Sequence, residues 1–393
     1  MLIPFDDYPV HQTSLPLGQT GAGNPNHYDR FWFNGFREDL LFGIAFCNYP
    51  NKQITDGAFS VLVNGRQTSL HCSARMKADP TDMDLGPLRI EIVEPMRVNR
   101  VVVDSPEYDI RADLTYTATT EAIEEVHQTA FSGNRHLMDV TRATQWGTWT
   151  GVIEVGGTVI DLADGAHATK DRSWGARLSP GAKDAAPIAP AGTLFLWSPI
   201  HFDSECFHYL VFEDTDGFPR IHDAALVPKT TLTRRTVDGT AQPAAGRRIA
   251  RVEHEISWLP GHRRARAAVL TPRTVDGESL GAIELEPLMC FQMKGLGYGH
   301  PVWGHGKWHG ESAVAAESYE PARLDPLSFE NLHVQQLVQA TWNGRSGLGV
   351  LEQLAMGPLP RYGFREFLDG AGVATPETAA SVGDTASADA AAN

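Results

Sequence analysis

Apolar and polar residues alternate along several short stretches of this chain. Between residues 250 and 258, the even-numbered positions are Ala, Val, His, Ile and Trp, whereas the odd-numbered positions are Arg, Glu, Glu and Ser. A period of two is typical of a β-strand that buries one face and exposes the other. Helical periodicity is scarce, and residues 120–127 form the one short helix that the pattern predicts.

Turn-forming pairs separate these stretches. Asn-Gly, Asp-Gly and Gly-Gly pairs recur along the chain, and they tolerate the positive φ angles of tight hairpin turns. Two hairpins are predicted, one with strands 208–212 and 221–227 around Asp216-Gly217, the other with strands 332–342 and 348–354 around Asn343-Gly344. The pattern therefore predicts an all-β protein made of antiparallel barrels or sandwiches.

Breaks in the pattern suggest two domains. Residues 179–192 are rich in Pro, Ala and Gly and are expected to form a long loop, and 236–246 is a second, polar break. We place an N-terminal β domain at 1–180 and a C-terminal β domain at 193–372. The tail 375–393 lacks large apolar residues, so it is predicted to be disordered.

Composition and charge limit the partners. The chain has 393 residues, 42% of them apolar, and a formal net charge of −15. This charge argues against a nucleic-acid partner, which requires clustered Lys and Arg. We expect no signal peptide and no membrane span, because no basic leader and no run of about 18 apolar residues occurs. The four cysteines are widely spaced, and a cytoplasmic protein is expected.

The segment His167–Arg177 (HATKDRSWGAR) concentrates ionisable residues around a tryptophan. If it is a strand, Arg172 and Trp174 share the face opposite that of Asp171. An aspartate beside basic residues is normally ionised, whereas burial favours the protonated acid, which could take part in proton transfer. The alternative is a charged strand end with Trp174 closing one mouth of a barrel.

The segment Gly295–Glu311 (GLGYGHPVWGHGKWHGE) contains six glycines, three histidines and two tryptophans. Three interpretations remain open. His300, His305 and His309 could bind a metal, although their spacing matches no common zinc pattern. The segment could line a lipophilic cavity. It could also be a tightly packed β-corner whose histidines bond to the backbone.

A third segment, Leu194–Asp214, interrupts an apolar strand pair with polar groups at Trp197, His201, Asp203 and Tyr209. Buried polar groups need hydrogen-bond partners, so their concentration here suggests a polar spot in an apolar pocket. The chain has no dinucleotide fingerprint, P-loop or nucleophile elbow. We therefore predict no organic cofactor. The preferred interpretation assigns no metal either, and only the hydrolase alternative requires one.

The run Lys170-Asp171-Arg172-Ser173-Trp174-Gly175, followed by the aromatic strand pair, resembles the hydroxyneurosporene synthase (carotenoid 1,2-hydratase) group. The match covers mainly residues 165–214, and residues 300–310 resemble a recurring element of related proteins. The resemblance implies lipocalin-like β-barrels around an apolar cavity and cofactor-free hydratase or cyclase chemistry on terpenoids. It also implies an aspartate as proton donor.

The run departs from that group at three positions. The hydratases have roughly His-Asp-His-Asn-Trp-Gly, so Lys170 and Arg172 replace two histidines and Ser173 replaces an asparagine. An arginine does not shuttle protons near neutral pH. The sequence therefore argues against carotenoid hydration itself, while Arg172 or Arg177 could anchor a carboxylate or enolate of the substrate.

Together these observations predict two lipocalin-like antiparallel β domains packed face to face, with the segments around Asp171 and His300 converging near their interface. The predicted function is cofactor-free acid/base chemistry (hydration or dehydration, isomerisation or cyclisation) on a hydrophobic terpenoid-, steroid- or aromatic-like molecule. The alternatives are a non-catalytic carrier of such a molecule and a metal-dependent hydrolase. The candidate catalytic residues are Asp171, Arg172, Asp203, His201 and His305, and the candidate substrate-binding residues are Trp174, Arg177, Trp197, Tyr209, Tyr298, His300 and Trp303.

Overall fold

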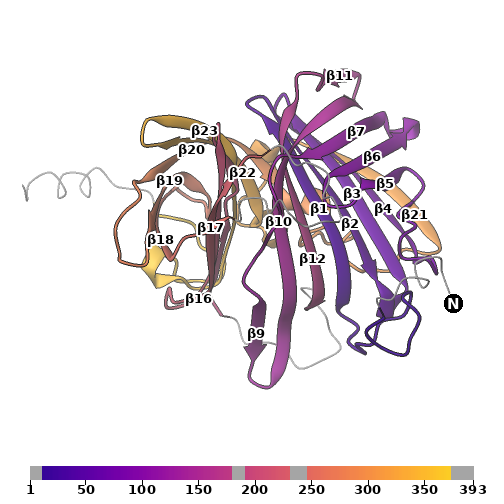
Figure 1. Ribbon diagram of the computed structural model, residues 1–393, viewed down its shortest axis with the longest axis horizontal. Helices are drawn as coiled ribbons and strands as arrows, with labels where there is room; N and C mark the ends of the chain where they lie inside the picture. Colours follow the sequence, from indigo (N-terminus) through magenta and orange to yellow (C-terminus); the bar gives the residue numbers. More distant parts are fainter. Residues whose placement is uncertain (1–10, 179–190, 231–245, 373–393) are drawn as a thin grey trace, which may run out of the picture.

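The computed structural model describes residues 11–178, 191–230 and 246–372. These residues form two large antiparallel sheets that pack side by side (Figure 1). The predicted all-β fold of two packed, lipocalin-like domains is confirmed. Most of the predicted loop at 179–192, most of the break at 236–246 and the tail at 375–393 lie outside the described residues.

The first sheet curls into a half-barrel with the strand order β21-β4-β3-β2-β1-β12-β10-β7-β6-β5, and β8, β9 and β11 pair with β10. Its strands are β1 (His27–Arg37), β2 (Leu40–Tyr49), β3 (Ile54–Val63), β4 (Arg66–Arg75), β5 (Leu88–Glu94), β6 (Val98–Ser105), β7 (Ile110–Ala118), β8 (Ile123–Glu124), β9 (Gln128–Ser132), β10 (Arg135–Val155), β11 (Thr158–Asp161), β12 (Ala166–Arg177) and β21 (Ser312–Tyr319). The second half of the chain therefore contributes the edge strand β21, drawn in orange beside β4 (Figure 1).

The second sheet has the order β17-β16-β15-β13-β23-β22-β20-β19-β18, and β14 pairs with β15 and β23. Its strands are β13 (Thr193–Trp197), β14 (Ile200–His201), β15 (Glu205–Asp214), β16 (Pro219–Pro228), β17 (Arg247–Arg248), β18 (Arg251–Trp258), β19 (Ala265–Arg273), β20 (Ile283–Gln292), β22 (Val334–Trp342) and β23 (Arg345–Met356). Short 3-10 turns complete the fold at Pro50–Lys52, Pro106–Tyr108, Met293–Leu296 (η4), Pro321–Arg323, Phe329–Asn331 and Pro360–Tyr362. No helix within the described residues has the length and apolar character needed to cross a bilayer.

Both predicted hairpins are present, as β15–β16 and β22–β23. The alternation at 250–258 corresponds to β18, which buries Val252 and His254. The short helix predicted at 120–127 is wrong. That stretch contains β8, which pairs with β10, so tertiary pairing overrides a weak local preference.

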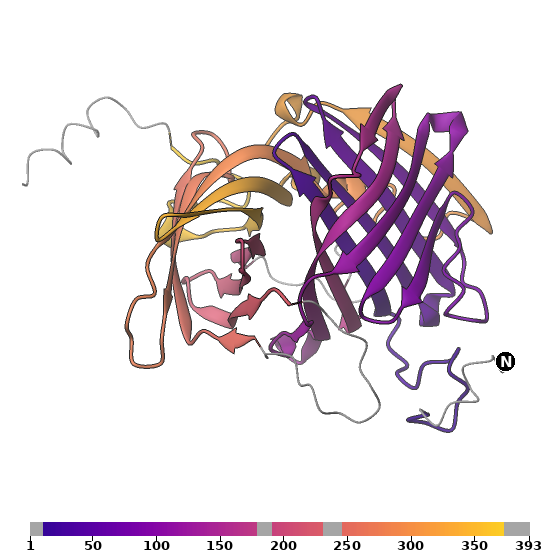
Figure 2. The ribbon, with the colours of Figure 1, turned by 45° about the horizontal axis from the view of Figure 1, so that its top comes forward.

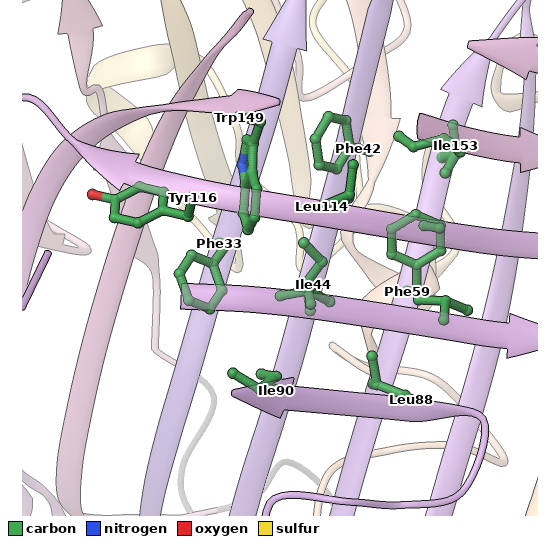
Figure 3. Close-up of a cluster of buried hydrophobic side chains, with 14 of the residues drawn as sticks. Phe33, Phe42, Ile44, Phe59, Leu88, Ile90, Leu114, Tyr116, Trp149 and Ile153 are labelled. Atoms are coloured by element: carbon green, nitrogen blue, oxygen red, sulfur yellow. The ribbon is translucent and has the colours of Figure 1, made fainter. Parts of the chain in front are cut away.

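Aromatic and aliphatic side chains fill the interior of the half-barrel (Figure 3). Phe33 packs edge-on against Tyr116 and Trp149, whose ring centroids lie 5.6 and 5.4 Å away. The Trp149 indole N–H donates to the Asn34 carbonyl, which satisfies its polar atom inside the core. Because these side chains occupy the interior, a ligand site must be sought on the outer face of the sheet.

That outer face packs against the second sheet. One buried cluster combines Trp32 and Phe36 of β1 with Phe195 and Trp197 of β13 and Leu337 of β22. Figure 2 shows the two sheets from a second direction, with the long strands of the first sheet next to the second. The interface between the sheets (hereafter the interdomain face) is therefore a second apolar core, separate from the interior of the half-barrel.

Candidate functional site

Strand β12 carries the ionisable segment singled out in the sequence, and its residues alternate between two environments. Lys170 points into the half-barrel, where Nζ donates to Asn99 Oδ1 at 2.8 Å beside the rings of Phe31 and Tyr116. Burial, followed by the charge of Arg172, lowers the pKa of Lys170 to about 8. Asp171 points the opposite way, to the interdomain face, so the two neighbours serve separate environments.

Asp171 forms a buried ion pair with Arg142 of β10. Its Oδ2 lies 2.5 Å from Arg142 Nη2, and both side chains are about one-tenth exposed. The second carboxylate oxygen, Oδ1, is buried without a protein partner. Trp32 and Thr144 flank Asp171 on the neighbouring strands. A buried carboxylate oxygen without a partner marks a place where a ligand or water donor can bind.

A second acid, Glu125, lies on the other side of Arg142. Its Oε1 accepts from Thr144 at 2.6 Å, and its Oε2 lies 3.6 Å from Arg142 Nε. Its side chain is fully buried. Burial raises the pKa of Glu125 to about 7, although the charge of Arg142 opposes that effect. Glu125 is therefore able to gain or lose a proton near neutral pH.

His208 of β15 approaches this pair from the second sheet. Its Nε2 lies 3.8 Å from Glu125 Oε1, and neither ring nitrogen has a hydrogen-bond partner. Burial lowers the pKa of His208 to about 3, so the ring is neutral. The arrangement places two acids, one arginine and a neutral imidazole where the two sheets meet.

Two tryptophans line the same part of the interdomain face. Trp32 packs edge-on against Trp197, with 5.5 Å between ring centroids, and the Arg142 guanidinium lies 5.8 Å from the Trp197 ring. Both indole N–H groups are buried without an acceptor. Trp197, a predicted site residue, thus contacts the environment of Asp171, while its partner Trp32 was not predicted.

A polar network continues along the interdomain face from Trp197. Glu352 of β23 lies opposite Trp197 in the strand register, and His333 and Gln335 bond to its two oxygens at 2.7 and 2.9 Å. Asn34 of β1 donates to Gln335 at 3.1 Å and so joins the two sheets. Glu352 is therefore fixed in place by both neighbours.

Tyr298 and His305, two further predicted residues, also reach this region. The Tyr298 ring lies 4.9 Å from that of His333 and 4.5 Å from that of His305, and its hydroxyl accepts from Arg30 at 3.1 Å. His305 bonds to the Leu296 carbonyl through Nε2 at 2.8 Å. Burial lowers the pKa of His305 well below its usual value, so it is a neutral donor.

His300, in contrast, lies near the far edge of the first sheet. It groups with His71 of β4 and Glu317 of β21, whose ligand atoms lie within 4.8 Å of one another. Strands β1, β2 and β3 separate β12 from β4, which is roughly 19 Å along the sheet. The segment 295–311 therefore contributes to two separate regions. Tyr298 and His305 lie by Arg30 and His333 at the interdomain face, whereas His300 lies by His71 and Glu317.

The tautomer of His300 bears on the metal interpretation. Its Nδ1 accepts from the backbone N–H groups of Val302 and Trp303 at 3.0 and 2.8 Å, so the proton of the neutral ring is on Nε2, which lies 3.4 Å from Glu317 Oε1. A histidine that binds a metal instead donates from its other nitrogen. The group therefore fits a carboxylate held between two imidazoles better than a metal centre.

This group predicts acid sensitivity. Burial alone would raise the pKa of Glu317, but His300 and His71 outweigh it and bring the pKa to about 2. A carboxylate whose pKa is lower in the folded state contributes stability above about pH 4.5, and this is lost as the pH falls toward 2. Because Glu317 is one-third exposed, we expect it to contribute only about 1 kcal/mol to the free energy of unfolding.

Urea unfolding between pH 7 and 3 tests this expectation. The stability of Glu317→Gln should fall less steeply with decreasing pH than that of the parent, whereas the exposed control Glu284→Gln should match the parent. Identical slopes for all three proteins contradict the assignment.

The remaining predicted residues lie elsewhere. Trp174 is 41% exposed, and Asp203 is exposed in a turn. Arg172 pairs with Asp29 at 2.8 Å and covers the Phe31 ring. His201 bonds to the Ala168 carbonyl, and Tyr209 bonds to His254 within the second core.

Trp303 stacks on His71 and His309. The cavity beneath this part of the segment, which also involves His305, has a volume of about 10 Å³. That is room for about one water molecule. In the structure, this segment packs closely against β3 and β4, and a ligand larger than water does not fit beneath it.

A family model described as a family of unknown function, DUF8625, matches residues 2–365. The chain belongs to this family. A search of curated proteins finds no match to this DUF8625 chain.

A solved structure shares this fold. A protein provisionally assigned as AttH from Nitrosomonas europaea is 16% identical, with a TM-score of 0.52 over 88% of the DUF8625 chain and 97% of its own. Two structures of CghA, one with Sch210972, are each 12% identical, with TM-scores of 0.41 and 0.42; they cover 84% of this chain and 88% and 89% of theirs. At 16% identity, the likeness to the Nitrosomonas europaea protein concerns the fold alone.

Proposed function

We propose that this protein is a cofactor-free enzyme that performs acid/base chemistry on a hydrophobic small molecule bound at the interdomain face. The observation that carries the proposal is the set of buried polar atoms without protein partners at Asp171 Oδ1, Trp32 Nε1 and Trp197 Nε1. Unsatisfied buried groups are costly, so their concentration between aromatic walls supports a role in binding. Asp171 and Glu125, whose pKa burial raises to about 7, also supply a proton acceptor and a proton donor.

The proposed reaction is proton transfer to or from an alkene or carbonyl. Glu125 donates a proton, and Asp171 or water accepts one to complete a hydration, isomerisation or cyclisation. The faces of Trp32 and Trp197 stabilise positive charge that develops on the apolar skeleton. The resemblance of residues 170–175 to the hydroxyneurosporene synthase group supports a terpenoid-like substrate and a lyase or isomerase reaction.

A carrier is the second candidate, because apolar walls alone suffice to bind a lipophilic molecule. The Asp171–Arg142–Glu125 group favours the enzyme. A carrier has no need of two acids on one buried arginine, since burying charges is costly unless they are paired or used.

Native mass spectrometry of the freshly purified full-length protein tests the binding part of this proposal. We expect a non-covalent adduct of one apolar molecule, which organic solvent releases and which is reduced at least tenfold in Trp197→Ala. Trp174→Ala is the matched control, because Trp174 is exposed outside the interdomain face. An equal adduct in the parent and Trp197→Ala, or loss only in Trp174→Ala, contradicts the proposed location.

A further inference from the structure

Arg30 is a buried cation without a carboxylate partner. It is 2% exposed, and it donates to the hydroxyls of Tyr298 and Tyr49 at 3.1 and 3.0 Å. Its Nε is buried with no acceptor. Among the described residues, no carboxylate lies within 4 Å of its guanidinium. Since a buried charge is costly unless it is paired, Arg30 lacks the anion that its position calls for.

Arg177 of β12 places a second positive charge beside the Tyr28 ring, which Arg30 also adjoins. The guanidinium groups of Arg177 and Arg30 lie 5.2 and 5.3 Å from the centroid of the Tyr28 ring. The Tyr28 hydroxyl is buried without a partner. Within the described part of the chain, Arg177 has no ion pair, so two guanidinium groups and a free hydroxyl donor adjoin one aromatic ring.

The nearby acids are already occupied. Asp171 is paired with Arg142, and Glu352 is bonded to His333 and Gln335. Arg30 on β1, Cys47 on β2 and Asp56 on β3 are aligned across the sheet, and Asp56 accepts the Gly306 N–H at 2.6 Å. Asp56 acts on Arg30 only through space, so within the described residues neither Arg30 nor Arg177 has a carboxylate in ion-pair contact.

We propose that Arg30, Arg177 and the Tyr28 hydroxyl form a subsite for a carboxylate or enolate on the bound molecule. The guanidinium fork suits such oxygen pairs because it donates two parallel hydrogen bonds. This inference rests on the proposed function and names its substrate class, an acidic lipophilic molecule.

The strand register relates this subsite to the acid pair. Arg30, Ser173 and Arg142 lie side by side on β1, β12 and β10. The next pair on the same face, Trp32 and Asp171, lies two residues away along the two antiparallel strands, which is about 7 Å. A ligand anchored at Arg30 therefore extends its apolar skeleton over Trp32 toward Asp171, so that the acidic group fixes which carbon meets the proton donor.

The test compares two probes of equal shape, 2-naphthoate and 2-naphthamide, by isothermal titration calorimetry at pH 7.5. We expect the wild-type protein to bind the naphthoate about tenfold or more tightly than the amide, because hydrogen bonds to charged groups are the stronger ones. Arg30→Met and Arg177→Met should each bring this ratio close to one while leaving the naphthamide affinity within about threefold. Arg220→Met, which removes an exposed arginine paired with Asp214, is the matched control and should keep the parent ratio.

The outcomes separate this inference from the proposed function. Equal binding of both probes to the wild type, or a preference that survives in both variants, overturns the anionic subsite and leaves the apolar site standing. Binding of neither probe overturns both. If Arg30→Met does not fold, the more exposed Arg177→Met still decides the result. Loss of preference in the Arg220→Met control as well assigns the effect to overall charge and overturns the subsite.

Discussion

Replacement of Asp171 by asparagine is expected to slow turnover by about 10²- to 10⁴-fold while the bound molecule is retained. The substitution keeps the shape of the side chain and an acceptor oxygen for Arg142, but it removes the ability to carry the transferred proton. The molecule released from the purified protein serves as substrate in D₂O buffer. Mass spectrometry of that molecule then measures deuterium or water incorporation, which reports proton transfer whichever reaction occurs.

Asp203→Asn provides the comparison for this experiment. Asp203 was the second acid predicted from the sequence, and the structure places it in an exposed turn. If Asp203→Asn loses incorporation and Asp171→Asn retains it, the transferred proton is carried by Asp203 and the assignment to Asp171 fails. Unchanged incorporation in both variants means that neither aspartate carries the transferred proton. No incorporation in the parent protein favours the carrier.

Replacement of Arg263 by methionine is expected to lower the free energy of unfolding by about 3–5 kcal/mol. Arg263 is 1% exposed, and its guanidinium donates to the carbonyls of Gly357, Glu366 and Asp369 at 2.6–2.8 Å and to the Asp369 carboxylate. Methionine fills similar space but leaves these buried acceptors without donors. Residues 357–369 should therefore detach from the second sheet at lower urea concentrations.

Arg266→Met is the matched control for this measurement. Arg266 lies three residues after Arg263, on β19, and is exposed, so its replacement is expected to change stability by less than about 0.5 kcal/mol. Urea titrations that follow tryptophan fluorescence compare both variants with the parent. Equal midpoints for Arg263→Met and Arg266→Met would show that the buried network contributes little.

The fold was predictable because its signals are local. Alternation with a period of two and Asn-Gly or Asp-Gly turns identified the β15–β16 and β22–β23 hairpins, since each strand pairs with its neighbour in sequence. The position of β21 was not predictable. It pairs with β4, more than 200 residues earlier, and no sequence feature of either strand indicates its partner.

The candidate site was predictable only in part for the same reason. Strand alternation sufficed to place Asp171 opposite Arg172. Its ion-pair partner Arg142 depends on the register between β10 and β12, which the sequence does not reveal. Glu125 and Arg30 stand in ordinary polar-apolar surroundings, and only the packing of the two sheets gives them their burial. No local sequence pattern therefore identifies Glu125 and Arg30 as site residues.

The contribution of β21 to the first sheet affects how the protein can be made and divided. During synthesis, the edge of β4 stays unpaired until residue 319 has left the ribosome, and an unpaired edge strand invites association with other chains. A gene fragment that stops in the 179–192 region would leave that edge open permanently. Expression of the N-terminal half alone should therefore yield aggregates, and co-expression with the C-terminal half should restore solubility.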